Sequence, residues 1–522
     1  MDTKALRQKI LDLAIRGKLV PQDPNDEPAG VLLESIREQK QQMLKEGKLK
    51  KKDIKNDTII FKGEDNLHYE KFQDGTVKCI EDEIPFEVPE GWCWTRLGSF
   101  FLTVTGSTPS TKDASLYGTE YPFYKPTDLN AGYNVYCAED SVSKKGYLSG
   151  RPLPKFSVLV TCIGATIGKT GYISNAGICN QQINAILPNS EILPAYTYFC
   201  MCSQYEQQQI CINSSATTLP ILNKSKFDNL LFPIPPKEQQ SQIVDRIKSL
   251  LLFVENIQNN QETLKKTVAE AKSKILDLAI RGKLVPQDPN DEPASVLIER
   301  IRAEKEELIK QGKIKRNKKE SVIFKGDDNS YYLRTGGIEE SLEDWRFDDL
   351  PETWKICCLG ELCDYGDCIN VNTEDIPEDA WILDLEDIEK DTGTVLKKVT
   401  KAQRNSVSTK HKFHSGQVLY SKLRPYLNKV VLSDADGYCT SEILPLEFKK
   451  CVLPEYARYY LMSSTFIAYA NHCSYGVKMP RLGTTDGKKA IFSLPPLSEQ
   501  KRIVETIDFY FMQLNKVSEA LA

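Results

Sequence analysis

One stretch of this chain occurs twice. The residues KILDLAIRGKLVPQDPNDEPA run from Lys9 to Ala29 and recur without change from Lys274 to Ala294. A long internal repeat marks a chain that is built from copies of one structural unit. We therefore expect two related halves rather than a series of unrelated domains.

A second pair of matching segments shows where each copy begins and ends. FPIPPKEQQSQIVDRI, residues 232–247, matches FSLPPLSEQKRIVETI, residues 492–507, at an offset of 260, whereas the repeat itself matches at an offset of 265. At these offsets the last residue of the chain falls opposite Glu262 and the first falls opposite Lys266. The middle of the chain thus contains the complete unit, and each chain end contains one part of a second copy. We therefore expect the two ends to meet in the fold.

Residues 236–281 contain the most regular pattern in the sequence. Apolar or small side chains recur there at alternating spacings of four and three residues, which is the seam of a coiled coil. The seam comprises Ile243, Ile247, Leu250, Val254, Ile257, the polar Gln261, Leu264, Val268, Ala271, Ile275 and Leu278. It recurs near the chain ends, at Ile503, Ile507, Tyr510, Leu514, Val517 and Leu521 and at Leu6, Ile10 and Leu13. We predict one long helix paired antiparallel with a helix made from the two chain ends; a homodimeric coiled coil is the alternative.

The segments on either side of the long helix have a different pattern. Short apolar stretches are divided there by Gly, Pro, Asn and Ser, which is typical of a globular α+β domain. Residues 194–211 are predicted to form one helix. The expected fold class is α+β, with two globular domains separated by a pair of long antiparallel coiled-coil helices in a pseudo-two-fold circular arrangement. The predicted order is a helix and charged linker (1–83), the first globular domain (84–235), the long helix (236–285), a second linker (286–344), the second globular domain (345–495) and a terminal helix (496–522).

The charged stretch after each repeat allows two interpretations. VLLESIREQKQQMLKEG, residues 31–47, alternates charges and ends in a run of lysines. Such charge runs are typical of a solvated linker helix. Docking against a partner subunit is the alternative.

Composition limits where a chain of this kind works. No apolar run reaches the roughly 18 residues that a membrane span needs, and the first residues lack the apolar core of a signal peptide. The 15 cysteines have irregular spacings, which is typical of a reducing compartment rather than of a disulfide framework. We therefore expect a cytoplasmic protein without a membrane partner.

Local charge indicates a polyanionic partner although the formal net charge is −4. Residues 141–190 contain no Asp or Glu, and neither do residues 392–433, while both windows carry several Lys and Arg. The two windows overlap when the halves are aligned by the repeat. Equivalent basic surfaces favour binding of a polyanion, to which phosphate contacts would give an affinity that falls steeply with salt. The alternative is an exposed face neutralised by counter-ions.

The side chains predicted to contact DNA are basic, amide, hydroxyl or aromatic. An Asn or Gln amide can bond an adenine edge, and Arg424 can bond a guanine. The candidates are Lys125, Thr127, Lys144, Lys145, Lys169, Asn180, Gln181 and Gln182 in the first domain, and Arg404, Lys410, Lys412, Lys422, Arg424, Tyr426 and Lys429 in the second. Amides in loops more often satisfy backbone groups, which is the alternative for each of them.

Motifs for catalysis are not found in the sequence. GATIGKT, residues 164–170, has three residues between its glycines where a phosphate-binding loop needs four. The cysteines lack paired CxxC spacing, so no zinc site is predicted. His411 and His414 stand in a basic stretch without an acidic or Cys partner, which favours phosphate contacts. No motif for holding a target base, for S-adenosylmethionine or for a nuclease carboxylate pair is present, so we predict no catalytic residue and no metal ligand.

Three features together resemble one known family. They are the repeat, the starts PPKEQQ and PPLSEQ of the long helices, and the openings WCWTRLG and WKICCLG of the two domains. The combination is similar to the specificity subunit of Type I restriction–modification systems. In that family two target-recognition domains each read half of a split DNA site, and paired spacer helices set the distance between them.

The resemblance also implies partners. Two methyltransferase subunits and two motor-nuclease subunits would join this non-catalytic chain, and it would direct adenine methylation or DNA cleavage by them. S-adenosylmethionine, ATP and Mg²⁺ are then expected in those partners and no cofactor in this chain. Two alternatives remain open: a coiled-coil scaffold that binds no DNA, and a self-contained DNA-modifying enzyme with unrecognised motifs.

Overall fold

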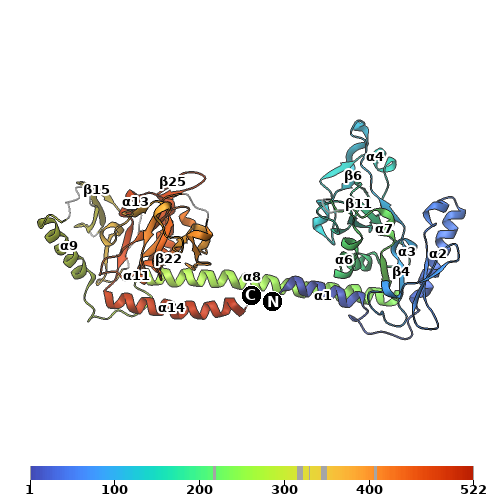
Figure 1. The fold of residues 1–522 in the computed structure, drawn as a ribbon, viewed down its shortest axis with the longest axis horizontal. Coiled ribbons are helices and arrows are strands. Elements are labelled where there is room, and N and C mark those ends of the chain that lie inside the picture. Colours follow the sequence, from blue (N-terminus) through green and yellow to red (C-terminus); the bar gives the residue numbers. More distant parts are fainter. Residues whose placement is uncertain are drawn as a thin grey trace. The chain divides into compact units, whose positions relative to one another are not determined.

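A computed structural model describes residues 2–215, 219–313, 321–328, 330–342, 350–404 and 408–520. The chain divides into two compact units, Met1–Asn260 (unit 1) and Gln261–Ala522 (unit 2). The boundary falls inside the helix α8 (Lys237–Ile280), whose 44 residues confirm the predicted long helix. Each unit therefore contains one half of α8 together with a globular head (Figure 1).

Apart from α8, the longest helices are α14 with 24 residues and α2 and α9 with 17 each. In unit 1 they are α1 Thr3–Ile15, α2 Ala29–Lys45, α3 Leu97–Phe100, α4 Lys144–Ser149, α5 Pro194–Met201, α6 Gln204–Asn213 and α7 Lys224–Asp228. In unit 2 they are α9 Ala294–Lys310, α10 Leu359–Leu362, α11 Pro454–Leu461, α12 Ser464–His472, α13 Thr484–Lys489 and α14 Leu497–Ala520. Within the described ranges, none of these helices has the length and apolar character that crossing a membrane requires.

The described strands of unit 1 form small sheets. A linker sheet contains β1 Ile59–Lys62, β2 His68–Lys71 and β3 Val77–Cys79 in the order β1-β2-β3. The head contains the sheets β12-β4, β10-β6-β7 and β5-β11-β8-β9. Their strands are β4 Cys93–Arg96, β5 Thr103–Thr105, β6 Tyr117–Tyr124, β7 Asp140–Val142, β8 Val158–Thr161, β9 Thr170–Tyr172, β10 Ile178–Cys179, β11 Ile183–Ile186 and β12 Leu231–Ile234.

Unit 2 repeats this plan with changes in the head. Its sheets are β13-β14-β15, β16-β27, β17-β20-β23-β18-β19, β22-β21-β24 and β25-β26. The strands are β13 Ser321–Lys325, β14 Tyr331–Thr335, β15 Ile338–Ser341, β16 Lys355–Cys358, β17 Ile369–Val371, β18 Trp381–Leu383, β19 Val399–Thr400, β20 Lys410–Phe413, β21 Val418–Ser421, β22 Val430–Leu432, β23 Gly437–Thr440, β24 Ile443–Leu446, β25 Ser474–Tyr475, β26 Arg481–Leu482 and β27 Ile491–Leu494. The mixed helix and strand content confirms the predicted α+β class.

In unit 1 the helix α1 packs on the first half of α8. Ile10 and Ile15 of α1 lie in the same buried cluster as Ile243 and Ile247 of α8. The indole Nε1 of Trp92 donates to Gln22 Oε1 at 3.1 Å and to Gln239 Oε1 at 3.0 Å. Because Gln22 follows the end of α1 and Gln239 stands at the start of α8, the two helices run antiparallel, as predicted.

In unit 2 the C-terminal helix α14 packs on the second half of α8, as α1 packs on the first half in unit 1. Ile503 and Ile507 of α14 share a buried cluster with Leu276 and Ile280, which stand in the second half of α8. Trp354, the counterpart of Trp92, donates its Nε1 proton to Glu499 Oε2 at 2.9 Å. Each terminal helix therefore pairs antiparallel with one half of α8 (Figure 1). The predicted meeting of the two chain ends would join the units, and it remains a prediction.

The repeated segment itself docks the end of a helix on the head. Gly17 has φ +64°, and a Cβ on it would lie 2.4 Å from the Pro89 ring; Gly282 has φ +65° and would meet Pro351 at the same 2.4 Å. Both the backbone conformation and the close approach require glycine. The unchanged repeat thus preserves one docking geometry in both units.

Residues 29–83 differ from the predicted solvated linker. Leu32, Leu33 and Ile36 of α2 are buried, and Lys40 is only 5% exposed. The Lys40 ammonium donates to the carbonyls of Gly98 and Ser99 at 2.7 and 2.9 Å, which holds α2 on the head. The sheet β1-β2-β3 that follows was not predicted, because its short strands bury few side chains and carry many charges.

Two further expectations need correction. The single helix predicted over 194–211 is two helices, α5 and α6, because Ser203 caps α6 by accepting from the amide of Glu206. In the outer half of the predicted α14 seam, Tyr510 and Val517 are 45% and 40% exposed and Leu514 is half-buried, so that half is only partly covered. The predicted member Leu521 lies outside the described residues.

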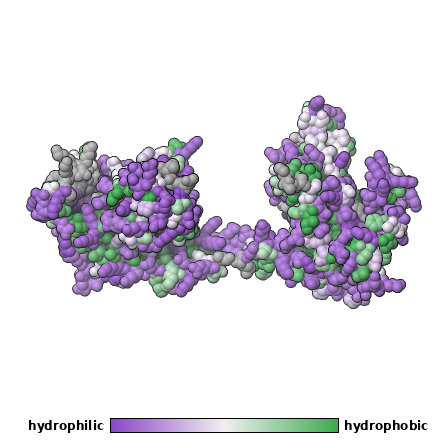
Figure 2. Space-filling view, in the orientation of Figure 1, coloured by the Kyte–Doolittle hydropathy of each residue, from purple (hydrophilic) through white to green (hydrophobic). Residues whose placement is uncertain are grey.

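Figure 2 shows that hydrophilic residues cover most of the visible face of each unit.

Candidate nucleic-acid interface

Several candidate residues of the two basic windows lie on a loop that both units share. In unit 1 this hairpin loop, residues 162–169, joins the antiparallel strands β8 and β9. In unit 2 residues 422–429 join β21 and β22 in the same way. The two loops have the same length, and their positions correspond one to one at the offset of 260 that relates the ends of the heads, although their residues differ.

A second segment, the entry turn, is bonded to the hairpin loop in both units. It consists of residues 180–182 before β11 and residues 440–442 before β24. The amide of Cys162 donates to Gln182 O at 2.7 Å, and the amide of Lys422 donates to Glu442 O at 3.0 Å. In unit 1 both segments lie in the basic window 141–190, whereas in unit 2 residues 440–442 lie outside the window 392–433. The structure brings the two segments into contact in both units.

A third segment, the closing segment, completes the cluster. It consists of residues 219–221 in unit 1 and 475–481 in unit 2. The amide of Gly164 donates to Pro220 O at 3.0 Å, and the amide of Arg424 donates to Pro480 O at 2.7 Å. Sequence reasoning missed this segment, although the prolines at 220 and 480 keep the same offset of 260. The hairpin loop, entry turn and closing segment together are called the three-segment cluster below.

The cluster of unit 1 presents amides. Asn180 Nδ2 donates to Gln182 Oε1 at 2.9 Å, and Asn180 Oδ1 accepts from the Gln182 amide at 3.1 Å. This leaves the Gln182 Nε2 protons for another acceptor. Gln181 is exposed and accepts from the Thr108 hydroxyl. Asn180 is therefore a support for the turn, whereas Gln181 and Gln182 are placed to contact a ligand.

The cluster of unit 2 presents a guanidinium and aromatic rings. Arg424 donates no side-chain hydrogen bond to any described residue, and its Nε is buried without an acceptor. Tyr426 and Tyr475 are 50% and 63% exposed, and Val477 is fully exposed. Exposed aromatic and apolar side chains around an unpaired cation are typical of a surface that a nucleic acid covers.

The carboxylate of Glu442, which belongs to the entry turn of unit 2, forms an ion pair with Arg481. Arg481 holds Glu442 through both carboxylate oxygens, with the closest Nη2–Oε1 distance 2.8 Å. Hydrogen bonding to Arg481 lowers the pKa of Glu442, so the carboxylate stays charged and paired. Arg424 and Lys422 are left without a carboxylate partner among the described residues. Their positive charge is available to a polyanion.

The other predicted DNA-contacting residues of unit 1 lie beside the three-segment cluster or on the helix α4. Lys169 donates to Pro126 O at 3.0 Å, so the 125–127 loop with Lys125 and Thr127 adjoins the base of the hairpin loop. Lys125 pairs with Asp140. Lys144 and Lys145 stand on α4, where Lys145 pairs with Asp113 at 3.1 Å. Of these, only Lys144 and Thr127 have no side-chain bond to a described residue.

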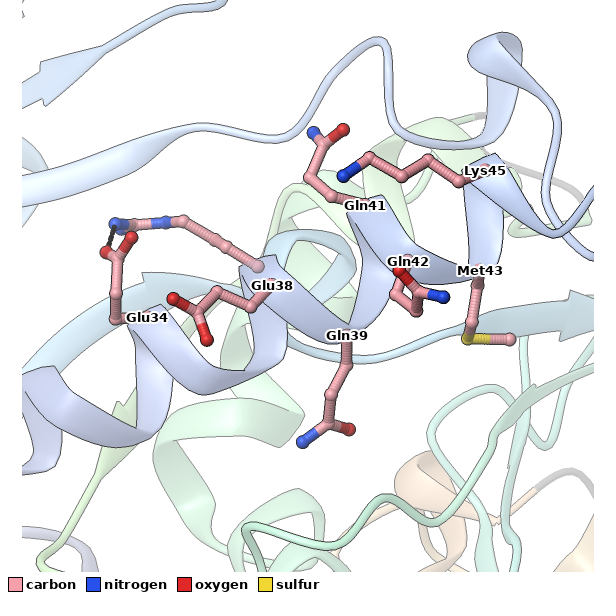
Figure 3. A pocket seen from close by; sticks show the side chains of 8 residues that line it. Glu34, Glu38, Gln39, Gln41, Gln42, Met43 and Lys45 are labelled. Carbon is pink, nitrogen blue, oxygen red and sulfur yellow. Dashed lines mark hydrogen bonds and ion pairs between the residues drawn. The ribbon is translucent and has the colours of Figure 1, made fainter.

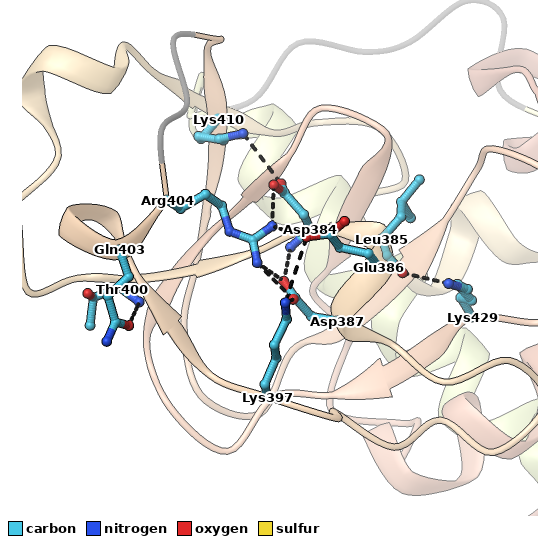
Figure 4. Close-up of polar contacts among 10 residues, drawn as sticks. All are labelled: Asp384, Leu385, Glu386, Asp387, Lys397, Thr400, Gln403, Arg404, Lys410 and Lys429. Atoms are coloured by element: carbon cyan, nitrogen blue, oxygen red, sulfur yellow. Dashed lines mark hydrogen bonds and ion pairs between the residues drawn. The ribbon is translucent and has the colours of Figure 1, made fainter. Parts of the chain in front are cut away.

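Several basic side chains in the window of unit 2 bond acidic groups of the same head (Figure 4). The Arg404 guanidinium bonds Asp384 at 2.5 Å and Asp387 at 2.7 Å. Burial disfavours its charge, but the hydrogen bonds to the two carboxylates outweigh that effect and raise the pKa of Arg404. Lys410, whose side chain is 3% exposed, lies 3.4 Å from the same Asp384. These two candidates hold the head together in the free protein.

Of the remaining basic residues in the window of unit 2, some bond groups of the head and one is exposed without a described partner. Lys429 donates to Leu385 O at 2.5 Å, and burial lowers its pKa. Lys412 is exposed on β20 without a described partner. His411 is buried and bonds Ile443 O, and the predicted absence of an acid near His414 is wrong, because its Nε2 lies 2.9 Å from Glu447. Phosphate contacts by the two histidines are therefore disfavoured.

Two other features lie outside the cluster. An open groove of about 700 Å³ runs along α2 (Figure 3). Charged side chains, amides and one methionine line it: Glu34, Arg37, Glu38, Gln39, Gln41, Gln42, Met43 and Lys45. Among the described residues, His68, Glu81 and Glu87 could face one cation. However, Glu81 already accepts from the amide and the ring of His68, and Glu87 pairs with Lys62 at 3.2 Å. Neither feature offers reaction chemistry.

Comparison with known proteins identifies the heads. Residues 89–266 and 351–520 match the family model described as the Type I restriction modification DNA specificity domain. The EcoEI specificity subunit of Escherichia coli is 26% identical over 99% of this chain and 90% of that relative. The EcoAI specificity subunit, also from that species, is 27% identical over 98% of this chain and 90% of its own length.

A solved structure shares the fold. It is described as "Structural basis underlying complex assembly and conformational transition of the type I R-M system", and it superposes with a TM-score of 0.53 at 17% identity. The match covers 84% of this chain and 94% of that one. The two matched domains make up more than half of the chain, which therefore belongs to the family of Type I restriction–modification DNA specificity subunits and recognises DNA sequence.

Proposed function

We propose that the two heads read the two unlike halves of one bipartite site in duplex DNA, each through its three-segment cluster. One observation carries this proposal. The same backbone hydrogen bonds build the cluster in both units, while the side chains that it presents differ, amides in unit 1 and Arg424 with tyrosines in unit 2. A constant framework with different contact groups supports recognition of an asymmetric target.

The bases between the half-sites would go unread in this proposal. Helix α8 runs through the boundary between the units and carries charged and polar residues rather than a base-reading surface. We assign it the role of a spacer.

The chain acts in this proposal without catalysing a reaction. Two methyltransferase subunits would methylate adenines and two motor-nuclease subunits would cleave DNA, and these partners would bind S-adenosylmethionine, ATP and Mg²⁺. All 15 cysteines are free thiols, and burial raises the pKa of Cys162 and Cys179 to about 12, so these thiols stay protonated and unreactive. Free thiols also support a cytoplasmic location.

Duplication of one head tests the proposal. The full chain is co-expressed with its methyltransferase partner, and methylated adenines are mapped across the host genome. A variant in which a second copy of residues 345–495 replaces residues 84–235 should methylate a symmetric site whose halves both equal the half read by unit 2. The wild-type chain is the control and should give an asymmetric site.

Three results would overturn the proposal. A duplicated variant that keeps the original asymmetric site would show that the heads do not read the halves. Failure of the wild-type chain to bind duplex DNA would favour a protein scaffold. Methylation or cleavage by the purified chain alone would favour a self-contained enzyme.

A further inference from the structure

The hairpin loop places different residues at one left-handed backbone position. At the offset of 260, Gly164 of unit 1 corresponds to Arg424 of unit 2, and Gly168 corresponds to Asn428. All four have positive φ, +101° and +85° for the glycines and +51° and +48° for Arg424 and Asn428. The loop conformation is thus common to both heads, but only unit 1 fills it with the residues that adopt it without strain.

The strain at position 424 has no structural need. Arg424 also precedes Pro425, and a residue before proline is restricted further. The contact that anchors the loop is the backbone amide of residue 424 on Pro480 O, and Gly164 makes the same contact on Pro220 O. Because glycine can make this bond, the arginine side chain is not needed for the loop to fold. Strain that folding does not require is a mark of a functional residue.

The loop that carries Arg424 is anchored, while the guanidinium has no partner among the described residues. Pro425 opens the short helical turn Pro425–Leu427, and Asn428 Nδ2 donates to Met462 O at 3.3 Å, so both ends of the loop are fixed. Arg424 has no side-chain acceptor among the described residues, and the nearby Glu442 is taken by Arg481. The backbone that carries Arg424 is therefore fixed, and its unpaired guanidinium can donate to a ligand.

The same position in unit 1 faces the entry turn. A Cβ built on Gly164 would have Gln182 Nε2 at 3.9 Å as one of its nearest neighbours and would meet no closer atom. A side chain at this position therefore enters open space beside the entry turn. With glycine there, the Gln182 amide is the group that unit 1 presents at this place.

We propose that position 164/424 determines the base preference of each head, and that Arg424 reads a guanine by donating two hydrogen bonds to its O6 and N7 in the major groove. Unit 1 lacks this group and presents the Gln182 amide there instead. This inference rests on the proposed function and names the residue that carries its specificity in unit 2.

A base edge fits the geometry better than a phosphate. A phosphate accepts from many directions, so a flexible lysine or arginine serves it without a strained backbone. A guanine edge requires two donors at a fixed spacing and orientation, which the arginine fork supplies and a lysine does not. The fixed loop and the left-handed backbone provide that orientation.

The test uses the full chain with its methyltransferase partner and genome-wide mapping of methylated adenines. Arg424→Gly, which installs the residue of unit 1, and Arg424→Lys, which keeps the charge, should both relax one base pair in the half-site read by unit 2. Discrimination at that base pair should fall by roughly 5- to 150-fold, the usual contribution of a bidentate contact. Lys450→Gly, which removes an exposed cation from the same head, is the control and should leave the site unchanged.

The outcomes separate the inference from the function on which it rests. An unrelaxed site in Arg424→Gly, with weaker methylation that Arg424→Lys restores, would show a phosphate contact and overturn the inference alone. Relaxation in the other half-site would also overturn it. If the wild-type chain directs no bipartite methylation, the proposed function fails. Thermal unfolding of each variant shows whether the head is folded. If the Arg424→Gly head does not fold, the Arg424→Lys variant still decides the test.

Discussion

At the scale of single residues, the two units differ in the side chain that accepts from the matching tryptophans Trp92 and Trp354. Glu499 is fully buried and accepts from Trp354 and Gln287, whereas unit 1 has Gln239 at the corresponding position. Burial raises the pKa of Glu499 above its usual value of about 4.5 despite these hydrogen bonds. The folded state therefore binds a proton more tightly than the unfolded chain does.

This proton linkage predicts a pH dependence that Glu499 contributes to the helix pair of unit 2. The stabilisation from protonated Glu499 is fully present below pH 4.5 and is lost as the pH rises through the raised folded-state pKa. Glu499→Gln should remove that part of the pH dependence, since its amide oxygen can still accept from Trp354. Hydrogen exchange of amides in α14, measured from about pH 4 to about pH 8 and corrected for intrinsic exchange, reports the local stability.

The reverse substitution is the matched control. Gln239→Glu should introduce the same loss of stability with rising pH into α1 and the first half of α8. Identical pH profiles for the wild-type chain and Glu499→Gln would contradict the assignment.

Single residues also show the limit of sequence reasoning at the candidate site. The acid-free window of unit 2 contained Lys422, Arg424 and Tyr426, which the structure places in the three-segment cluster. The window also contained Arg404 and Lys410, whose acidic partners Asp384 and Asp387 precede it in the sequence and reach them only through the folded sheet. Charge along a sequence does not reveal pairing across strands.

At the scale of elements, α8 and the antiparallel pairing of each terminal helix were predictable. The seam period and the two repeat offsets are properties of the sequence itself, and buried clusters confirm the pairing in both units. The linker sheets and the closing segment were not predictable in this way, because short strands with mixed charge lack a clear alternation. The left-handed conformation shared by Gly164 and Arg424 required coordinates.

The docking of helix ends on the heads gives an element-scale prediction. Gly17→Ala and Gly282→Ala should each destabilise their own unit by at least about 1–2 kcal/mol, because alanine is disfavoured at positive φ and its Cβ would overlap a proline ring. Denaturant unfolding followed by hydrogen exchange would locate the loss in α1 for Gly17→Ala and in the second half of α8 for Gly282→Ala.

Gly47, which has no close neighbour, serves as the control for the two docking glycines. Gly47 also has positive φ, +73°, but a Cβ on it would meet nothing within 4 Å. Gly47→Ala therefore measures the backbone cost alone. An equal loss for Gly17→Ala and Gly47→Ala would show that the proline contact contributes nothing.

At the scale of the whole molecule, each unit combines one head with a helix pair that comes from different parts of the chain. Unit 1 uses the first residues and the start of α8, and unit 2 uses the end of α8 and the last residues. A head can therefore differ in its three-segment cluster while the helices that carry it stay the same. This separation of framework and contact groups is the basis for treating α8 as a spacer of set length.

The spacer role predicts that helix length sets the gap between the half-sites. Seven residues inserted after Asn260, with seven helical residues added after Ala520 to extend the opposing helix, keep the 3.5-residue seam in phase. At about 1.5 Å per residue the insertion adds about 10 Å, which corresponds to about three base pairs at about 3.4 Å each. Methylation mapping should then show both half-sites unchanged and the gap about three base pairs longer. A three-residue insertion, which breaks the seam, should abolish methylation, and an unchanged gap in the seven-residue variant would show that α8 does not set the distance.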